Sequence, residues 1–126
     1  MLIKILLFVF ISSFTLANEN KIGSVSELSG VIIAINENLD ERDLLIHDPI
    51  FINEEIFITE GSSATIQFED NTAIIMKELT SLNVSEFENS KLNPKIKAKL
   101  LKGKITIESG SIAKNSNGEM IVDVLT

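Results

Sequence analysis

Apolar residues alternate with polar ones between Ile56 and Val84, and this spacing restricts the fold of the chain more than any other feature. The run holds four apolar segments, which begin near positions 56, 64, 73 and 81 and are separated by polar or turn-forming residues. Period-two alternation rich in β-branched residues is typical of strands with one buried face. Short strands at even spacing predict an all-β fold, stacked as a β-solenoid-like or compact sandwich domain.

The N-terminal residues 1–17 have the layout of a secretory signal peptide. Lys4 is the only charge, and an apolar core precedes a short segment that ends at Ala17. This order predicts cleavage between Ala17 and Asn18. The alternative is a retained membrane anchor, although residues 2–16 as a helix would span roughly 22 Å of a bilayer core about 30 Å thick. We therefore expect a periplasmic or secreted protein without a transmembrane segment after cleavage.

The composition limits the partners and the chemistry of the chain. Without the predicted leader, 11 − 1 = 10 Lys and Arg face 18 Asp and Glu, a formal charge of −8. Net negative charge argues against nucleic acid as a partner. The lack of Cys excludes a disulfide, a thiolate metal site and lipid attachment through cysteine.

Candidate catalytic or metal-binding residues are few. Glu69 and Asp70 are consecutive, and neighbours on an extended chain point to opposite faces. We interpret them as solvated acids of a turn, rather than as a reactive pair. The acidic residues 36–43 lack the residue order of a calcium loop, so we expect a solvated loop there and at residues 54–55. His47, the only histidine, has no Cys partner for zinc and no nucleophile elbow, and we expect no enzyme, metal or cofactor.

Lysines alternate with apolar residues over positions 95–100, and the alternation changes phase near Gly103, where we expect a bulge or turn. One interpretation is an edge strand that its lysines guard against unwanted pairing. The alternative is recognition of an acidic partner or an anionic surface. The candidate partner-binding residues are Lys95, Lys97, Lys99, Lys102 and Lys104.

Strand and turn motifs follow one another in a definite order. A short strand ending in Thr, an alternating strand ending in Phe, an Asp-Asn turn and an apolar strand precede Ser-x-Leu, Glu-Phe and Leu-Lys-Gly elements. These motifs occupy residues 56–59, 63–68, 70–71, 74–76, 81–84, 86–87, 100–104 and 109–114. Their order resembles the FecR-like domain of exported bacterial proteins. Asn53-Glu54 and Asn71 stand where that family has Gly-Asp and Gly, and Asn71 can keep the turn because Asn tolerates the left-handed conformation.

The resemblance implies that residues 18–126 form an exported, non-catalytic interaction or sensing domain with a protein partner in the cell envelope. The protein that gives the family its name regulates a sigma factor through a cytoplasmic segment and a membrane helix. The resemblance does not imply that activity, because neither part has a counterpart in this sequence. Family members usually continue past the position of Thr126. We therefore expect a fragment or a shortened form, with an open strand edge suited to β-augmentation. The alternative function is a structural or adhesin-like fragment of a larger secreted surface protein.

Overall fold

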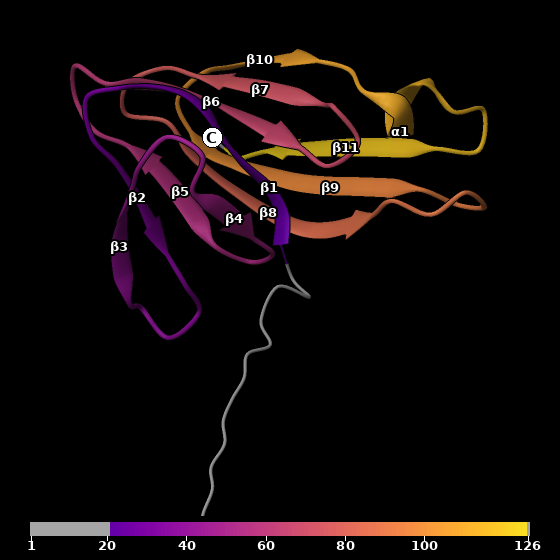
Figure 1. Ribbon diagram of the computed structural model, residues 1–126, viewed down its shortest axis with the longest axis horizontal. Helices are drawn as coiled ribbons and strands as arrows, with labels where there is room; N and C mark the ends of the chain where they lie inside the picture. The colour runs from indigo at the N-terminus through magenta and orange to yellow at the C-terminus, as the bar shows by residue number, and fades with distance from the viewer. Residues whose placement is uncertain (1–20, 126) are drawn as a thin grey trace, which may run out of the picture.

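The computed structural model describes residues 21–125, and nearly all of its regular structure is β (Figure 1). The all-β prediction is confirmed. The predicted leader and its cleavage point at Ala17 and Asn18 lie outside the described residues. In chain order the elements are β1 (Lys21–Ser29), β2 (Ile32–Ile35), β3 (Glu41–Leu44), β4 (Pro49–Phe51), β5 (Glu55–Ile58), β6 (Ser63–Phe68), β7 (Ala73–Met76), β8 (Ser81–Glu88), β9 (Lys95–Lys102), β10 (Ile105–Glu108), α1 (Ser111–Lys114) and β11 (Glu119–Val124).

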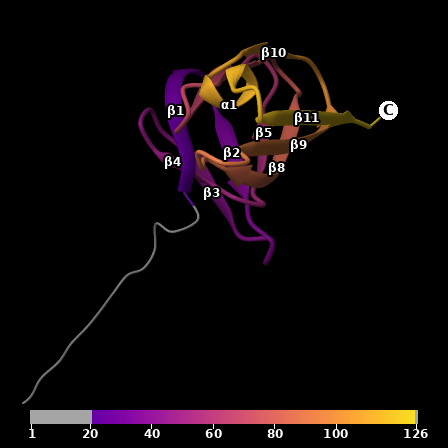
Figure 2. The same cartoon turned by 90° about the vertical axis from the view of Figure 1, so that its right-hand side faces the viewer.

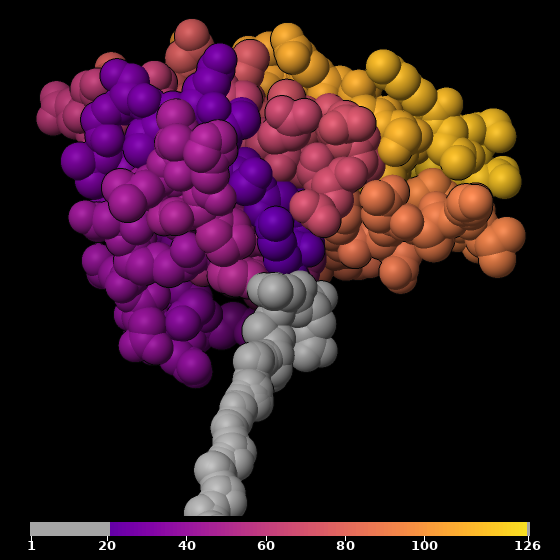
Figure 3. Space-filling view, viewed as in Figure 1, coloured from indigo at the N-terminus to yellow at the C-terminus, as the bar shows by residue number. Residues whose placement is uncertain are grey.

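The strands form two sheets (Figure 2). Sheet A has the strand order β10-β7-β6-β1-β4, and sheet B has the order β11-β9-β8-β5-β2-β3. Pairing is antiparallel in sheet A, whereas in sheet B the edge strand β11 runs parallel to β9. The N-terminal part of the described chain gathers at one end of the molecule and the C-terminal part at the other (Figure 3).

Apolar residues of both sheets fill one core. The period-two pattern places Ile66 of β6 and Ile74 of β7 inward from sheet A, and Leu82 of β8 inward from sheet B. The rings of Phe68 and Phe87 join the sheets through an edge-to-face contact, with centroids 5.8 Å apart and planes at 73°. Full burial of each large aliphatic side chain contributes about 1.5–3 kcal/mol, so this core is the main source of stability.

Turns occupy most of the expected positions. Asn71, in the turn between β6 and β7, has φ 72°, the left-handed conformation that its residue type permits. Gly103 has φ 91° between β9 and β10, where the phase change indicated a turn. The expectation of a solvated loop over residues 36–43 is wrong in its second half. The Asn36 side chain accepts hydrogen bonds from the backbone N–H groups of Asn38 and Asp40, and this tight turn leads directly into β3.

Among residues 21–125, no helix has the length and apolar character needed to cross a membrane.

Candidate functional site

The lysine-rich strand β9 is an interior strand of sheet B. It pairs with β8 on one side and with β11 on the other. The interpretation of this segment as an edge guarded by lysines is therefore wrong. The reason lies in the following residues, since β11 returns beside β9 and takes the edge position itself.

Three lysines of β9 point away from the core, and each has an acidic residue on at least one neighbouring strand. Lys95 Nζ lies 3.3 Å from Glu86 Oε1 on β8 and 4.0 Å from Glu119 Oε1 on β11. Lys97 is opposite Glu86, and Lys99 is opposite Asp123. On the other side Lys97 is opposite Ile121 and Lys99 is opposite Asn83, so the lysines are partly balanced by acids and do not form a free basic stripe.

The other two predicted lysines lie in different surroundings. Lys102 Nζ is 5.1 Å from the ring centroid of Phe57, on the outer face of sheet B. Lys104 precedes β10 and accepts a backbone hydrogen bond from Lys77 at 3.2 Å, which places it beside sheet A. The structure thus separates Lys104 from the β9 row, and the five lysines do not form one surface.

Each sheet has two edge strands, and three of the four are protected. β3 carries charges at three of its four residues, β4 has three residues and begins with Pro49, and β10 has four residues. Charge, proline and short length all discourage pairing with another chain. β11 is the exception, because its six residues read EMIVDV and are mostly apolar. Among the described residues it is the longest and least guarded edge.

The backbone of β11 presents its free groups at alternate residues. Glu119 N–H donates to Pro94 O and Leu125 N–H donates to Leu100 O, both at 3.0 Å. In a parallel ladder the same residues offer both N–H and C=O to one neighbour. The intervening residues Met120, Val122 and Val124 therefore direct their N–H and C=O groups to the open side. Val124 is 60% exposed, so the apolar strand extends into solvent.

Asp70 anchors the segment that leads into β11. It is only 2% exposed, and its carboxylate accepts hydrogen bonds from Thr72 N at 3.1 Å, Thr72 Oγ1 at 2.8 Å and Ile112 N at 3.0 Å. Its backbone oxygen also accepts the Ser111 N–H at 2.9 Å. The interpretation of Asp70 as a solvated acid is wrong, because residues far along the chain cover and satisfy it. Glu69 is exposed, as expected.

Gly110 is required where this segment meets the β6–β7 turn. A Cβ at position 110 would lie 2.3 Å from both Asp70 O and Thr72 N, so only glycine permits the two backbones to approach. The Gly110 N–H donates to Thr72 Oγ1 at 3.2 Å. The α1 segment is therefore fixed by tight backbone contact as well as by the Asp70 carboxylate.

Glu54 belongs to a second buried polar centre, and the expectation of a solvated acid there is wrong. Arg42 donates to both of its carboxylate oxygens, with Nη2 to Oε1 at 2.8 Å and Nε to Oε2 at 3.2 Å. Arg42 Nη2 also donates to Pro49 O, and Glu54 Oε1 accepts the Phe51 N–H. These contacts tie β3 to β4 and make Glu54 structural. His47 lies exposed in the turn between β3 and β4.

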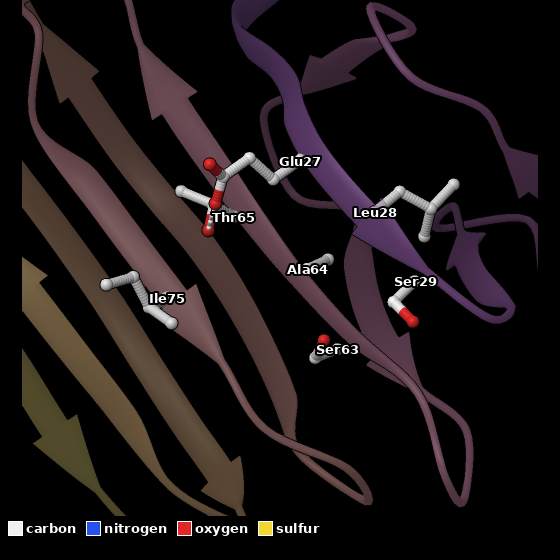
Figure 4. A pocket seen from close by; sticks show the side chains of 7 residues that line it. All are labelled: Glu27, Leu28, Ser29, Ser63, Ala64, Thr65 and Ile75. Carbon is white, nitrogen blue, oxygen red and sulfur yellow. Dashed lines mark hydrogen bonds between the residues drawn. The ribbon is translucent and has the colours of Figure 1, made fainter.

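Two open cavities adjoin each other at sheet A. The smaller, of about 260 Å³, is lined by both polar and apolar side chains of β1, β6 and β7, including Leu28 and Ile75 (Figure 4). Within it Thr65 Oγ1 donates to Glu27 Oε1 at 3.1 Å. The larger, of about 790 Å³, shares Ser63 with the first and includes Lys77 and Lys104. In residues 21–125 no group of three or more His, Cys, Asp or Glu side chains is placed to hold a metal ion.

Fold and edge together define a two-sheet β domain with one long unpaired strand edge among its described residues. No family model matches the sequence, and no curated protein matches it. The chain is similar to a solved structure described as "Cell surface anchoring domain", with 32% sequence identity and a TM-score of 0.47. That similarity covers 49% of this chain and 82% of the other. The resemblance to FecR-like domains is not tested by these comparisons and stays a prediction.

Proposed function

We propose that this protein is an exported, non-catalytic interaction or sensing module of the bacterial cell envelope, with a FecR-like fold. It binds an extended segment of a protein partner as an additional strand beside β11. The observation that supports this proposal is the contrast between β11 and the protected edges. A six-residue, mostly apolar edge with free backbone groups is suited to β-augmentation, in which main-chain hydrogen bonds supply affinity and alternate side chains supply specificity.

Apolar side chains are available to receive such a segment. Met120 and Val122 of β11, and Ile105 and Ile107 of β10, pack against the core but are only partly buried. Val124 and Leu125 are 60% and 50% exposed. An added strand with apolar residues at alternate positions would cover this surface. Each fully buried large aliphatic side chain would contribute about 1.5–3 kcal/mol before the cost of ordering the segment.

The β9 lysines have a supporting role in this proposal. A strand added beside β11 would lie about 10 Å from β9, since neighbouring strands are about 4.8 Å apart. This distance is similar to the screening length of roughly 8–10 Å at physiological salt. Lys97 and Lys99 would therefore favour an acidic segment weakly, and Lys97→Gln with Lys99→Gln would reduce capture slightly.

Substitutions at Val124 test the proposed edge directly. Val124→Pro removes an outward N–H and places a ring on the open side, while the β9 ladder keeps its bonds through the adjacent residues. Val124→Ala is the matched control, because it shortens the side chain but retains the N–H. We expect Val124→Pro to weaken capture of the partner roughly tenfold more than Val124→Ala.

A photo-reactive residue placed at Leu125 in the exported protein would identify the captured segment in cells, with Asp43 on β3 as the control position. Cross-links should form from position 125 and should be lost with Val124→Pro. Thermal unfolding of both Val124 variants would verify that the fold is retained. Equal capture by the two variants, or cross-links mainly from position 43, would contradict the proposal.

A further inference from the structure

Lys77 and Lys104 lie directly opposite each other at the end of sheet A. Met76 of β7 pairs with Ile105 of β10, and Lys77 N–H donates to Lys104 O at 3.2 Å, which continues the same antiparallel register by one residue. Met76 and Ile105 point to the core, so both lysines point to the outer face. Ser63 of β6 occupies the next position in this row, because Ala64 pairs with Met76.

This arrangement brings two positive charges close together. Directly opposite residues of antiparallel strands have Cα atoms about 4.5–5.5 Å apart, and like charges at such positions destabilise a sheet. Among residues 21–125, neither ammonium has a carboxylate within ion-pair distance. The nearby Glu78 instead accepts the Gly61 N–H at 2.7 Å. Lys95 offers a contrast, because two carboxylates flank it.

The turns hold the lysine backbones in place. Thr80 Oγ1 accepts the Lys104 N–H and donates to Lys104 O, both at 3.0 Å. Gly103 has φ 91°, and a Cβ there would collide with Thr80, so the two turns fit closely. Leu79 is exposed beside them. The open cavity of about 790 Å³ is lined by these turns, Glu78 included, and by Gly61, Ser62 and Ser63. The Glu78 carboxylate in this lining is engaged by the Gly61 N–H.

We propose that this cavity binds a phosphate group, which the Lys77 and Lys104 ammonium groups and the Ser63 hydroxyl would contact. A doubly charged oxyanion removes the repulsion between the lysines and accepts several charge-assisted hydrogen bonds. The site lies on sheet A and is independent of capture at the β11 edge. The phosphate could be a free ion or part of a phospholipid head group, and the experiment below separates these sources.

Thermal unfolding and NMR titration with inorganic phosphate, at constant ionic strength set with chloride, test the site. We expect a saturable rise in melting temperature and shifts at residues 61–63, 77–79 and 103–104. Lys77→Gln or Lys104→Gln should weaken phosphate binding roughly tenfold. In low salt without phosphate, each should also melt above the unmodified protein. Lys91→Gln, which removes an exposed loop lysine, should do neither.

Vesicles of phosphatidic acid, with phosphatidylcholine vesicles as control, form the second arm. Binding to phosphatidic acid that is lost in both lysine variants assigns the phosphate to a lipid surface, whereas binding of inorganic phosphate alone assigns it to a free ion. If a lysine variant fails to fold, Ser63→Ala should still lower phosphate affinity. The proposal is overturned if neither form binds, if Lys91→Gln reduces binding as much, or if the NMR shifts map elsewhere.

Discussion

The two edge strands of sheet B, β3 and β11, differ in the character of their side chains. β3, at one end, carries Glu41, Arg42 and Asp43, whereas β11, at the other, is mostly apolar along its length. Figure 1 shows the two strands on opposite sides of the molecule. Charged edge strands resist pairing with another chain, and apolar ones invite it. The difference indicates that β3 is protected against pairing with another chain and that β11 is not.

The two edges also differ in how they are anchored. β3 contributes its own Arg42 to the bidentate contact with Glu54, so the strand is held directly. β11 is held by its backbone ladder to β9, and the segment before it is fixed by Asp70, which binds the backbone of α1. One side of the β11 backbone is bound to β9 and the other side is open to a further strand. The predictions below test each part of this comparison.

The largest expected effect is at Asp70. Asp70→Ala would leave Thr72 N–H, Thr72 Oγ1 and Ile112 N–H without their acceptor in a buried site. We expect a loss of about 3–4 kcal/mol in the free energy of unfolding, because each buried unsatisfied donor costs about 1–3 kcal/mol and partial rescue by water is expected. Urea unfolding measures this loss, and hydrogen exchange should show β11 opening first.

Glu69→Ala is the matched control for Asp70, since Glu69 is the exposed neighbour in the same turn. It should change stability by less than about 0.5 kcal/mol. Equal effects of the two substitutions would mean that Asp70 does not anchor α1.

The second effect concerns the anchor of β3. Glu54→Ala would leave the Arg42 guanidinium without its main partner and free the Phe51 N–H. Loss of one partner of a fully buried pair costs about 3–5 kcal/mol. The Arg42 side chain is 35% exposed, so water should reduce the cost to about 2–3 kcal/mol. Urea unfolding gives the value, and protection of β11 amides should be unaffected. Loosening of β11 instead would mean that the two anchors are coupled.

The local pattern of the sequence was sufficient for the strands and for most of their inward faces. Alternation places Ala64, Ile66 and Phe68 on one side of β6, and all three are buried. The positive φ of Asn71 also follows from its residue type. Such features depend on near neighbours along the chain, which is why a single sequence reveals them.

Features that depend on distant residues were missed. Asp70 is buried by Ile112, which is 42 positions away, and nothing next to Asp70 indicates this contact. The β9 lysines alternate in the same way whether the strand is an edge or an interior strand, because in both cases one face is in water. Arg42 would have indicated the buried ion pair with Glu54, since a sole arginine near several acids is well suited to a bidentate ion pair.

The third prediction gives β3 the apolar character of β11. Glu41→Val with Asp43→Val would make β3 apolar on its outer face and remove like-charge repulsion between two copies of the strand. We expect roughly tenfold stronger self-association through β3, measured by analytical ultracentrifugation, since such pair terms amount to about 1 kcal/mol. Glu41→Lys with Asp43→Lys keeps the edge charged and should leave association unchanged. Self-association that rises equally in both double variants would show that edge charge does not protect β3.

The smallest effect is expected at Lys95, the lysine of β9 with carboxylates on both sides. Lys95→Gln removes its contacts with Glu86 and Glu119, but all three side chains are at least one-third exposed. Exposed ion pairs contribute about 0–1 kcal/mol, so the free energy of unfolding should fall by no more than about 0.5 kcal/mol, and less in high salt. A urea titration at two salt concentrations measures both quantities. A loss above about 2 kcal/mol would exceed the usual range for exposed pairs and would mean that the Lys95–Glu119 contact holds β11 in place, so that this strand is anchored through its own side chain as β3 is.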